Sequence, residues 1–293
     1  TKDTKQNSQE YFRVTPDSAR FWIRELQAKG VKGGFAVGGL TNMTKENPYN
    51  MLFIAPDSAR IYIRDSIASK GRKGGFAVGG LTNMTKDGIA GRYLDMTPQN
   101  YLIGHEAGKY LTTGLYNSFL GFQVGMNSTT GSYNTFLGYK AGLSSNSSYN
   151  TFIGFQVGTS NTTGQYNAFM GYNAGTSNTS GGSNVFIGNE AGRSNTTGVN
   201  NVFLGYLAGY SSNSNNNVFI GNESGRNNTS GAGNAFMGYY AGRANTTGSY
   251  NVFIGNNSGN TNTTGSSNLF IGNASGYTNY AGSWNTFLGF EAG

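Results

Sequence analysis

The chain contains no cysteine, one histidine, four prolines and few charged residues among its 293 residues. Without cysteine, neither a disulfide nor a thiolate metal site can form. With a single histidine, a metal site would have to rely on carboxylates. No apolar run approaches the roughly 18 residues that a transmembrane helix needs, and no segment has the pattern of a signal peptide. We therefore expect no cofactor, no metal and no membrane contact in this segment.

Charged residues make up only 11% of the chain, and they are unevenly distributed. Residues 1–99 hold 15 Lys/Arg and 9 Asp/Glu, whereas residues 100–293 hold 5 and 4. The basic residues are scattered, unlike the clustered footprint of a nucleic-acid-binding surface. We therefore predict that the excess positive charge is solvated and that the chain binds no nucleic acid. Because the chain starts at Thr1 and stops at Gly293 within a repeat, we expect it to be a fragment of a longer polypeptide.

Glycine, by contrast, is abundant at 47 residues, and the chain has 19 Phe and 19 Tyr. A composition rich in Gly, Ser, Asn and Thr is typical of disordered segments. Here, however, the apolar residues recur at a fixed spacing, for which a disordered chain has no need. The spacing predicts a folded repeat architecture.

Residues 100–293 repeat every 16 or 17 residues. The unit reads approximately N-x-F-[LIM]-G-[aromatic or N]-x-[AVS]-G-x-x-N-T-T-G-x-[YS], and its twelfth copy stops at Gly293. The copies begin at Asn100, Asn117, Asn134, Asn150, Asn167, Asn184, Asn201, Asn217, Asn234, Asn251, Asn268 and Asn285.

A short apolar strand opens each repeat. Its third residue is Leu102 in the first copy and phenylalanine in all others. The phenylalanines, which we predict to form a core or oligomer column, are Phe119, Phe136, Phe152, Phe169, Phe186, Phe203, Phe219, Phe236, Phe253, Phe270 and Phe287. Neighbours in a strand point to opposite faces, so the Leu, Ile or Met that follows must face the other way. Two apolar faces indicate burial on both sides, one inside the coil and the other against a second copy of the chain.

Glycines at the fifth and ninth positions permit positive φ, and N-T-T-G has the composition of a turn. We therefore expect each coil to contain two short strands and two turns, with the asparagine and aromatic residues stacked into ladders. At the spacing of neighbouring strands, twelve coils would form a rod of about 55 Å. The expected fold class is an all-β parallel solenoid, or β-roll.

Residues 1–99 carry a longer repeat. The segment V14-TPDSARFWIR returns as I54-APDSARIYIR, and K32-GGFAVGGLTNMTK returns from Lys73. A partial third copy begins at Leu94 and runs directly into the shorter repeats. Apolar residues around Phe21–Arg24 and Ile61–Arg64, and within K-G-G-F-A-V-G-G, predict strands, while Pro16, Pro56 and Pro98 predict turns. We expect a second β-rich region over 1–99, joined to the solenoid at 100–293 without a linker.

The N-[TSAV]-[FV]-[LI]-G unit followed by A-G resembles the head repeats of trimeric autotransporter adhesins, which form a left-handed parallel β-roll from shorter repeats. It also resembles long repetitive surface proteins of gliding and predatory bacteria. In that group, P-D-S-x-R-x-Y-I and K-G-G-F-A-V-G-G units often precede the array, and many members end in a self-cleaving chaperone domain shared with phage tail fibres. The resemblance implies a homo-oligomeric extracellular fibre, most often a trimer, although a higher ring remains open.

Residues able to carry catalysis are few. His105 occupies a position that is Tyr or Phe in most other copies, so we expect it to pack rather than catalyse. The acids of the array are Glu106, Glu190, Glu223 and Glu291. They lie several coils apart, whereas glycosidase chemistry needs two carboxyl groups within about 5–10 Å. Triplets of the form N-x-[ST], which begin at Asn127, Asn161, Asn195 and Asn262, are expected to be turn residues rather than glycan acceptors.

These observations favour a non-enzymatic structural and adhesive fibre at the cell surface. Its partners would be further copies of itself and surface glycans or cells, engaged by many weak identical contacts. The candidate contact residues are Tyr139, Tyr172, Tyr206 and Tyr239, because an aromatic ring with a polar tip suits such surfaces. Two alternatives remain: an ice- or lattice-binding solenoid that uses the Thr-Thr pairs, and a tailspike-like enzyme that degrades glycans.

Overall fold

The computed structural model describes residues 12–15, 18–21, 52–55, 58–61 and 94–293. The chain divides into two compact units, residues 1–81 and 82–293. The first contains a four-stranded antiparallel sheet in the order β1 (Phe12–Thr15), β2 (Ser18–Phe21), β3 (Leu52–Ala55) and β4 (Ser58–Ile61). The predicted turn residues Pro16 and Pro56 and the K-G-G-F-A-V-G-G segments lie outside the described residues.

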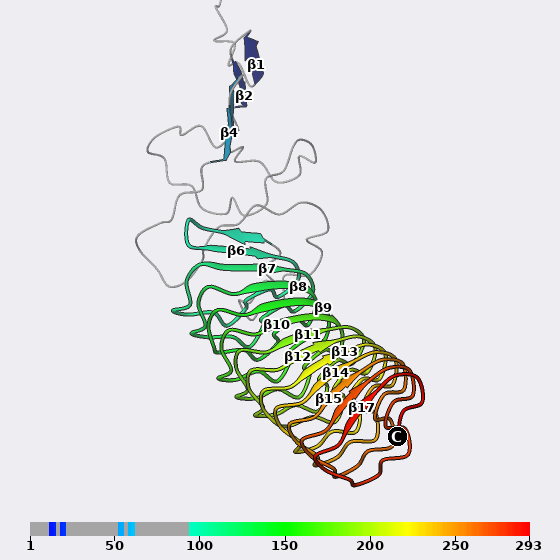
Figure 1. The fold of residues 1–293 in the computed structure, drawn as a ribbon. Coiled ribbons are helices and arrows are strands. Elements are labelled where there is room, and N and C mark those ends of the chain that lie inside the picture. The colour runs from blue at the N-terminus through cyan, green and yellow to red at the C-terminus, as the bar shows by residue number, and fades with distance from the viewer. Residues whose placement is uncertain (1–11, 16–17, 22–51, 56–57, 62–93) are drawn as a thin grey trace, which may run out of the picture. The chain divides into compact units, whose positions relative to one another are not determined.

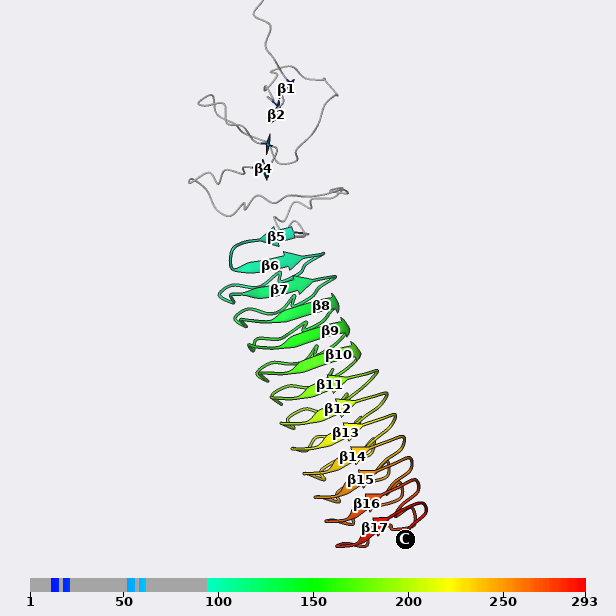
Figure 2. The same ribbon diagram turned by 45° about the horizontal axis from the view of Figure 1, so that its top comes forward.

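The second unit is an all-β parallel solenoid (Figures 1 and 2). β5 (Leu94–Met96) pairs antiparallel with β6, so the predicted turn at Pro98 joins the two strands of a hairpin. Twelve parallel strands then stack along the solenoid, one from each coil. They are β6 (Asn100–Ile103), β7 (Asn117–Leu120), β8 (Thr135–Tyr139), β9 (Thr151–Phe155), β10 (Ala168–Tyr172), β11 (Val185–Ile187), β12 (Val202–Leu204), β13 (Val218–Ile220), β14 (Ala235–Met237), β15 (Val252–Ile254), β16 (Leu269–Ile271) and β17 (Thr286–Leu288).

Each coil contains one strand rather than the predicted two. We number coil positions from the initial asparagine, so the strand covers roughly positions 1–4 and the rest of the coil consists of turns and bends. The expectation of a second strand was wrong because positive-φ residues at positions 7 and 9, such as Asn173 and Gly175, bend the chain where that strand would lie. Extended β geometry requires negative φ at successive residues.

The phenylalanine column forms the core. Strands pair in register, so that Phe169 lies between Phe152 and Phe186. Consecutive rings stack with centroids 4.6–5.0 Å apart. All are buried except Phe287 in the last coil, which is partly buried. The Ala, Val or Ser at position 8 is also buried in coils 1–11, and this small side chain leaves room for the ring. The prediction that one apolar column fills the coil interior is confirmed.

A second internal column is made of the position 1 asparagines. The backbone N–H of Asn251 donates to Oδ1 of Asn234 at 2.9 Å, and its own Oδ1 accepts from the N–H of Asn268 at 3.0 Å. Its Nδ2 donates to the carbonyl of Gly265 at 2.8 Å, which closes the turn of the same coil. Asparagine therefore links neighbouring coils and also fixes the corner of its own.

Glycine at position 5 is required by both backbone conformation and space. Gly205 has a φ of 139°, where side-chain-bearing residues are strongly disfavoured. A Cβ atom built on it would lie 2.4 Å from the carbonyl oxygen of Gly221 in the next coil. Close approach of the coils at this corner therefore excludes any side chain.

Candidate functional site

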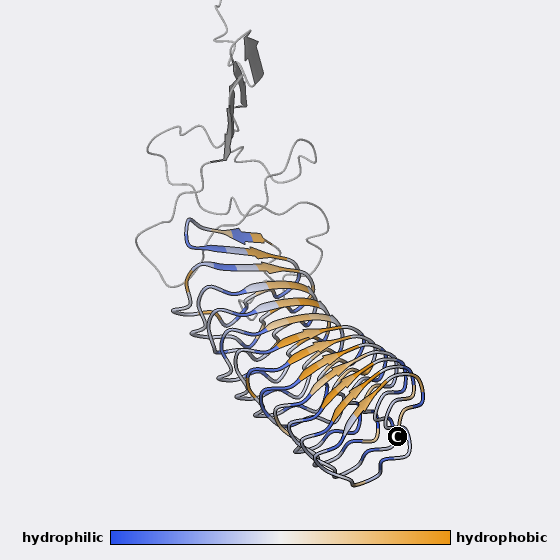
Figure 3. Cartoon of the chain, in the orientation of Figure 1, coloured by the Kyte–Doolittle hydropathy of each residue, from blue (hydrophilic) through white to orange (hydrophobic). Residues whose placement is uncertain are grey.

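The face of the sheet turned away from the core contains one strand from each of the twelve coils. Positions 2, 4 and 6 of a coil point away from the core, whereas the phenylalanine at position 3 points into it. β8, which covers positions 2–6, shows this alternation as exposed, buried and exposed residues. We call these positions in the twelve coils the outward face. Figure 3 shows the apolar strands side by side along one side of the solenoid, with hydrophilic turns around them.

Apolar side chains form a continuous column at position 4 of the outward face. Leu, Ile or Met occupies this position in every coil. Ile187 is 40% exposed and Leu120 is 46% exposed, values unusual for a regular column of large aliphatic residues. The predicted second apolar column is therefore present, and within a single chain it remains partly open to solvent.

The outward face also lacks formal charge. Position 2 carries small or β-branched residues in most coils, and position 6 carries Tyr, Phe, Asn or, in the first coil, His105. No Lys, Arg, Asp or Glu occurs at positions 2, 4 or 6 of any coil. The charged residues of the solenoid after Asn100 all lie at positions 7 and 10, which are in the turns.

The predicted contact tyrosines lie at position 6 of the outward face and are between 37% and 48% exposed. The ring of Tyr139 lies between those of Phe122 and Phe155, with centroids 5.3 and 4.9 Å away. Tyr172 stacks on Phe155 at 5.1 Å. Because stacking covers both faces of Tyr139, it presents its ring edge and hydroxyl outward rather than a face on which a sugar could stack. Tyr239 stacks on Tyr240 at 3.9 Å, and Tyr206 is 48% exposed between coils that carry asparagine at this position.

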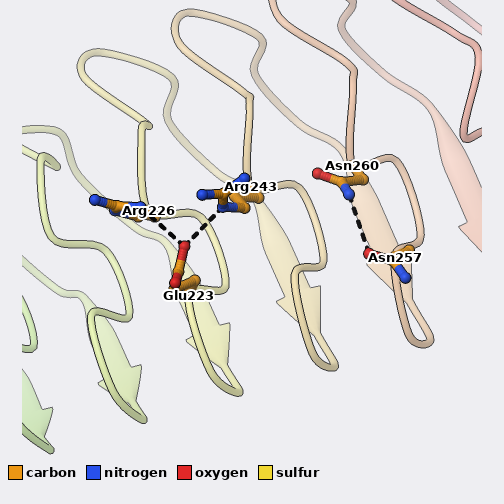
Figure 4. A network of polar contacts seen from close by, with 5 residues as sticks. All are labelled: Glu223, Arg226, Arg243, Asn257 and Asn260. Atoms are coloured by element: carbon orange, nitrogen blue, oxygen red, sulfur yellow. Dashed lines mark hydrogen bonds and ion pairs between the residues drawn. The ribbon is translucent and has the colours of Figure 1, made fainter.

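Ion pairs connect side chains at positions 7 and 10 of the turns in coils 1, 6, 8 and 9. Glu106 accepts from Lys109 at 2.7 Å, and Glu190 pairs with Arg193 at 3.3 Å. Glu223 is held by Arg226 of its own coil at 3.0 Å and by Arg243 of the next coil at 2.7 Å. Figure 4 shows the two guanidinium groups converging on this carboxylate, with Asn257 and Asn260 repeating the i, i+3 contact further along.

These contacts favour the ionised form of two of the carboxylates, Glu223 and Glu106. Burial raises the pKa of Glu223, but hydrogen bonds and charge from Arg243 and Arg226 outweigh it, so its pKa lies below the usual value. Hydrogen bonds from Lys109 and Gln123 likewise lower the pKa of Glu106. A general acid needs a raised pKa, so these two residues are suited to structural ion pairs rather than to proton donation.

The other residues considered for chemistry lie apart. His105 stacks on Phe122 with centroids 5.1 Å apart, as its shared column with Tyr and Phe predicts. Within the described part of the chain, no three His, Asp or Glu side chains are grouped so that they could hold a metal ion. The same residues contain no helix with the length and hydropathy to cross a membrane.

Burial of the asparagine side chain distinguishes among the N-x-[ST] triplets. Asn161, Asn195 and Asn262 occupy position 12 and are fully buried inside the coil. Their amides are therefore inaccessible to a glycosyltransferase in the folded chain, and the prediction that they are turn residues is supported. Asn127 lies one position earlier and is exposed.

The first threonines of the Thr-Thr pairs do not form a row of free hydroxyls. At position 13, Thr162, Thr179 and Thr246 each donate through Oγ1 to the carbonyl of the residue one coil further on, at 3.0 Å. Lattice binding would need these hydroxyls to face outward in an unbroken array. The 16-residue coils interrupt the column with Asn146 and Asn213.

One surface feature was not anticipated from the sequence. Tyr116, Tyr133, Tyr149 and Tyr166 occupy position 17 of the first four coils and stack on one another at the edge of the outward face. The signal was present as the final Tyr of the repeat unit. Only the coil geometry shows that the four rings are in contact while remaining about half exposed.

Comparisons with protein-family models, curated protein sequences and solved structures gave no match to this chain.

Proposed function

We propose that this chain is a structural and adhesive segment of an extracellular, homo-oligomeric surface fibre, and that it is not an enzyme. The observation that carries the proposal is the uncharged outward face, with its apolar column at position 4 in all twelve coils. Monomeric soluble proteins rarely expose a large continuous apolar patch, and such patches mark interaction sites.

The dimensions of the outward face suit a stable interface. Twelve strands and about five residue steps give an area about 55 Å long and 17 Å wide, roughly 900 Å². Specific interfaces bury about 800 Å² on each partner. A second copy of the chain has the same spacing between coils, so its aliphatic residues match this face coil by coil. Homo-oligomers usually close with rotational symmetry, and we favour three chains around one axis because the repeat resembles the head repeats of trimeric autotransporter adhesins.

Adhesion is assigned to what remains exposed after assembly. The turns carry polar residues of similar type from coil to coil, and assembly of three or more chains multiplies them. Weak contacts to glycans or cell surfaces then gain from effective concentration. Rigidity supports this function, because the asparagine and phenylalanine columns hold every coil in a single register.

Charge placed on the outward face tests the proposal. A triple variant, Ile187→Lys, Ile220→Lys and Met237→Lys, introduces ammonium groups at position 4 of coils 6, 8 and 9. Burying unpaired charge costs several kcal/mol, so we expect light scattering to report dissociation to single chains with unchanged circular dichroism. The matched control carries Ser194→Lys, Asn227→Lys and Ala244→Lys at position 11 of the same coils and should remain assembled. Assembly of the first variant, or dissociation of the second, would contradict the proposed interface.

The adhesive function has its own measurement. Beads coated with assembled chain should bind glycan-bearing surfaces or cells more strongly than beads coated with the same mass of the dissociated triple variant. Equal binding of the two kinds of bead would contradict multivalent adhesion. If neither kind of bead bound, the adhesive function itself would be contradicted.

A further inference from the structure

Four tyrosines at the edge of the outward face form a continuous exposed stack, which we call the tyrosine column. It consists of Tyr116, Tyr133, Tyr149 and Tyr166, one from each of the first four coils. Each successive pair of rings has centroids 5.1 Å apart. The side chains are between 47% and 60% exposed, so that the phenol groups are both in contact with each other and accessible from solution.

The backbone at position 17 does not favour tyrosine. Tyr116, Tyr133, Tyr149 and Tyr166 have φ values of 59–62°, in the left-handed region. This conformation favours Gly, Asn and Asp, and it is strained for residues with larger side chains. Later coils carry the more suitable Asn200, Asn216 and Gly233 at the same position. Residues held in a disfavoured conformation at an exposed site point to a role beyond the fold.

The kinds of aromatic residue found at position 17 indicate what that role is. Phenylalanine occurs repeatedly in the exposed stack at position 6, as in Phe122 and Phe155, so a ring without a hydroxyl is sufficient for stacking on this surface. At position 17 the aromatic residues are always Tyr or Trp, including Tyr250 and Trp284, and never Phe. Tyr and Trp are the aromatic side chains that undergo one-electron oxidation readily, which Phe does not.

We propose that the tyrosine column is a site of oxidative cross-linking, in which dityrosine bonds join neighbouring coils of the same chain. A one-electron oxidant, such as a peroxidase charged by hydrogen peroxide, removes one electron from each of two phenols, and each phenol releases its O–H proton. The two radicals form a carbon–carbon bond between ring positions next to the oxygens. The hydrogens on those carbons move to the phenol oxygens as aromaticity is restored. Each bond thus removes two hydrogens, and one peroxide becomes two waters.

The stacked arrangement brings the reacting rings together before oxidation. Exposed side chains change rotamer within picoseconds to nanoseconds, so rings already in contact can turn edge to edge within the lifetime of a radical. A bond between successive coils closes a loop of 16 or 17 residues. In the chain-entropy treatment of disulfides, a cross-link stabilises a fold by lowering the conformational entropy of the unfolded chain. Such bonds would prevent the first coils from separating under tension.

Peptide mapping provides a direct test. The full chain is treated with peroxidase and hydrogen peroxide, digested with trypsin and analysed by mass spectrometry. Trypsin cleaves after Lys109, Lys140 and Arg193, so a Tyr133–Tyr149 bond joins peptide 110–140 to peptide 141–193. We expect this joined pair, lighter by two hydrogens than the sum of its parts, together with the blue fluorescence of dityrosine.

Two controls make the result decisive. The double variant Tyr133→Phe and Tyr149→Phe keeps four stacked rings but leaves no adjacent phenols in the column, so its yield of the joined pair should fall to background. A variant with Tyr250→Phe and Tyr280→Phe removes exposed tyrosines from later coils and should retain the full yield. Urea present during oxidation should abolish the preference for the Tyr133–Tyr149 pair. Equal yields in folded and unfolded chain, or bonds mainly between chains, would overturn the proposal.

Discussion

At the residue scale, the asparagines of position 1 are the polar groups on which the coil depends most. Asn251 is fully buried and makes three kinds of contact: to the preceding coil, to the following coil and to the turn of its own coil. The sequence predicted this ladder, because asparagine recurs at a fixed position. It did not predict the bond from Nδ2 to the position 15 carbonyl, which depends on where the turn returns to the strand.

Replacing Asn251 with alanine should therefore be costly. The change leaves the N–H of Asn268 without its acceptor in a buried site, which costs about 1–3 kcal/mol. It also removes one of the two side-chain donors to the carbonyl of Gly265, which keeps its hydrogen bond from Nδ2 of Asn262. We expect urea denaturation of Asn251→Ala to give a free energy of unfolding lower by about 2–4 kcal/mol. Asn222→Ala, an exposed asparagine on the outward face, should lie within about 0.5 kcal/mol of the parent chain. Similar losses in both variants would mean that the ladder has no special role.

The Glu223 carboxylate gives the solenoid a defined dependence on pH. Its pKa in the folded chain lies below the ordinary value of 4.5, owing to Arg243 and Arg226 outweighing the effect of burial. A carboxyl whose pKa is lowered by folding stabilises the folded state above its unfolded pKa. That contribution is lost as the pH falls through the folded value.

Glu223→Gln should accordingly lower the free energy of unfolding by about 1.5–3 kcal/mol at neutral pH, the range for hydrogen bonds to charged groups. It should also flatten the fall of Tm below about pH 4.5, where the parent chain loses this ion pair. Melting curves across pH 2–7 provide the measurement. Glu291→Gln, an exposed carboxyl of the last coil, serves as the control and should follow the parent chain. If both variants keep the parent slope, Glu223 is not responsible for it.

At the scale of the coil, two coils have 16 residues instead of 17, and the structure shows how they keep their contacts with the neighbouring coils. In coils that begin at Asn134 and Asn201, Asn146 and Asn213 replace the Thr-Thr pair. Elsewhere the N–H of a position 13 threonine donates to a backbone carbonyl of the next coil. Here Oδ1 of Asn213 accepts instead from the N–H groups of Thr196 and Thr197, at 2.9 and 2.8 Å. The side-chain amide takes the place of a missing peptide group.

The same two coils are adjusted inside. In the 17-residue coils from the fourth onward, the position 12 side chain is asparagine and position 15 is glycine. In the short coils, Ser212 and Ser214 occupy these places, and their hydroxyls are hydrogen bonded at 3.2 Å. Ser145 and Ser147 repeat the arrangement. Serine is smaller than the asparagine of position 12 and larger than the glycine of position 15. The two changes in volume offset each other, so the interior stays filled.

The side chain of Asn213 contacts the preceding coil only through Oδ1, which accepts hydrogen bonds. Removing this acceptor should therefore weaken the contact between the two coils. Asn213→Ala should lower the free energy of unfolding by about 1–2 kcal/mol, because it removes several hydrogen bonds of roughly 0.5–1.5 kcal/mol each at an exposed turn. Asn213→Asp keeps an acceptor in the same place and should retain most of the stability. Hydrogen exchange at the amides of Thr196 and Thr197 should quicken in the alanine variant alone. Equal exchange in both would contradict this account.

The period of the coil, its single inward phenylalanine column and its glycine corners followed from the repeat alone. The number of strands per coil did not, because glycine and turn residues mark where the chain bends without showing which segments between bends are extended. Nor did the short coils, since a side chain that imitates a backbone carbonyl is visible only when the neighbouring coil is in place.

At the scale of the whole molecule, the solenoid resembles other repeat arrays in that each coil contacts only its neighbours. Its unusual feature is the contrast between the ion-paired turns and the uncharged outward face. The sequence predicted two apolar columns, the second of them packed against another copy of the chain. A single chain leaves that second column partly open, with Ile187 40% exposed and Leu120 46% exposed. Exposed flat sheet faces of this kind favour association.

The central claim is that copies of the chain assemble through this face, and the mass of the native particle tests it most directly. Light scattering coupled to size-exclusion chromatography should give a fixed multiple of the 31.1 kDa chain, with three chains the expected number, across a wide range of protein concentrations. A larger closed ring would retain the interface and change only its symmetry. A stable, soluble monomer at high concentration would contradict the account, because the apolar column of position 4 would then need no partner.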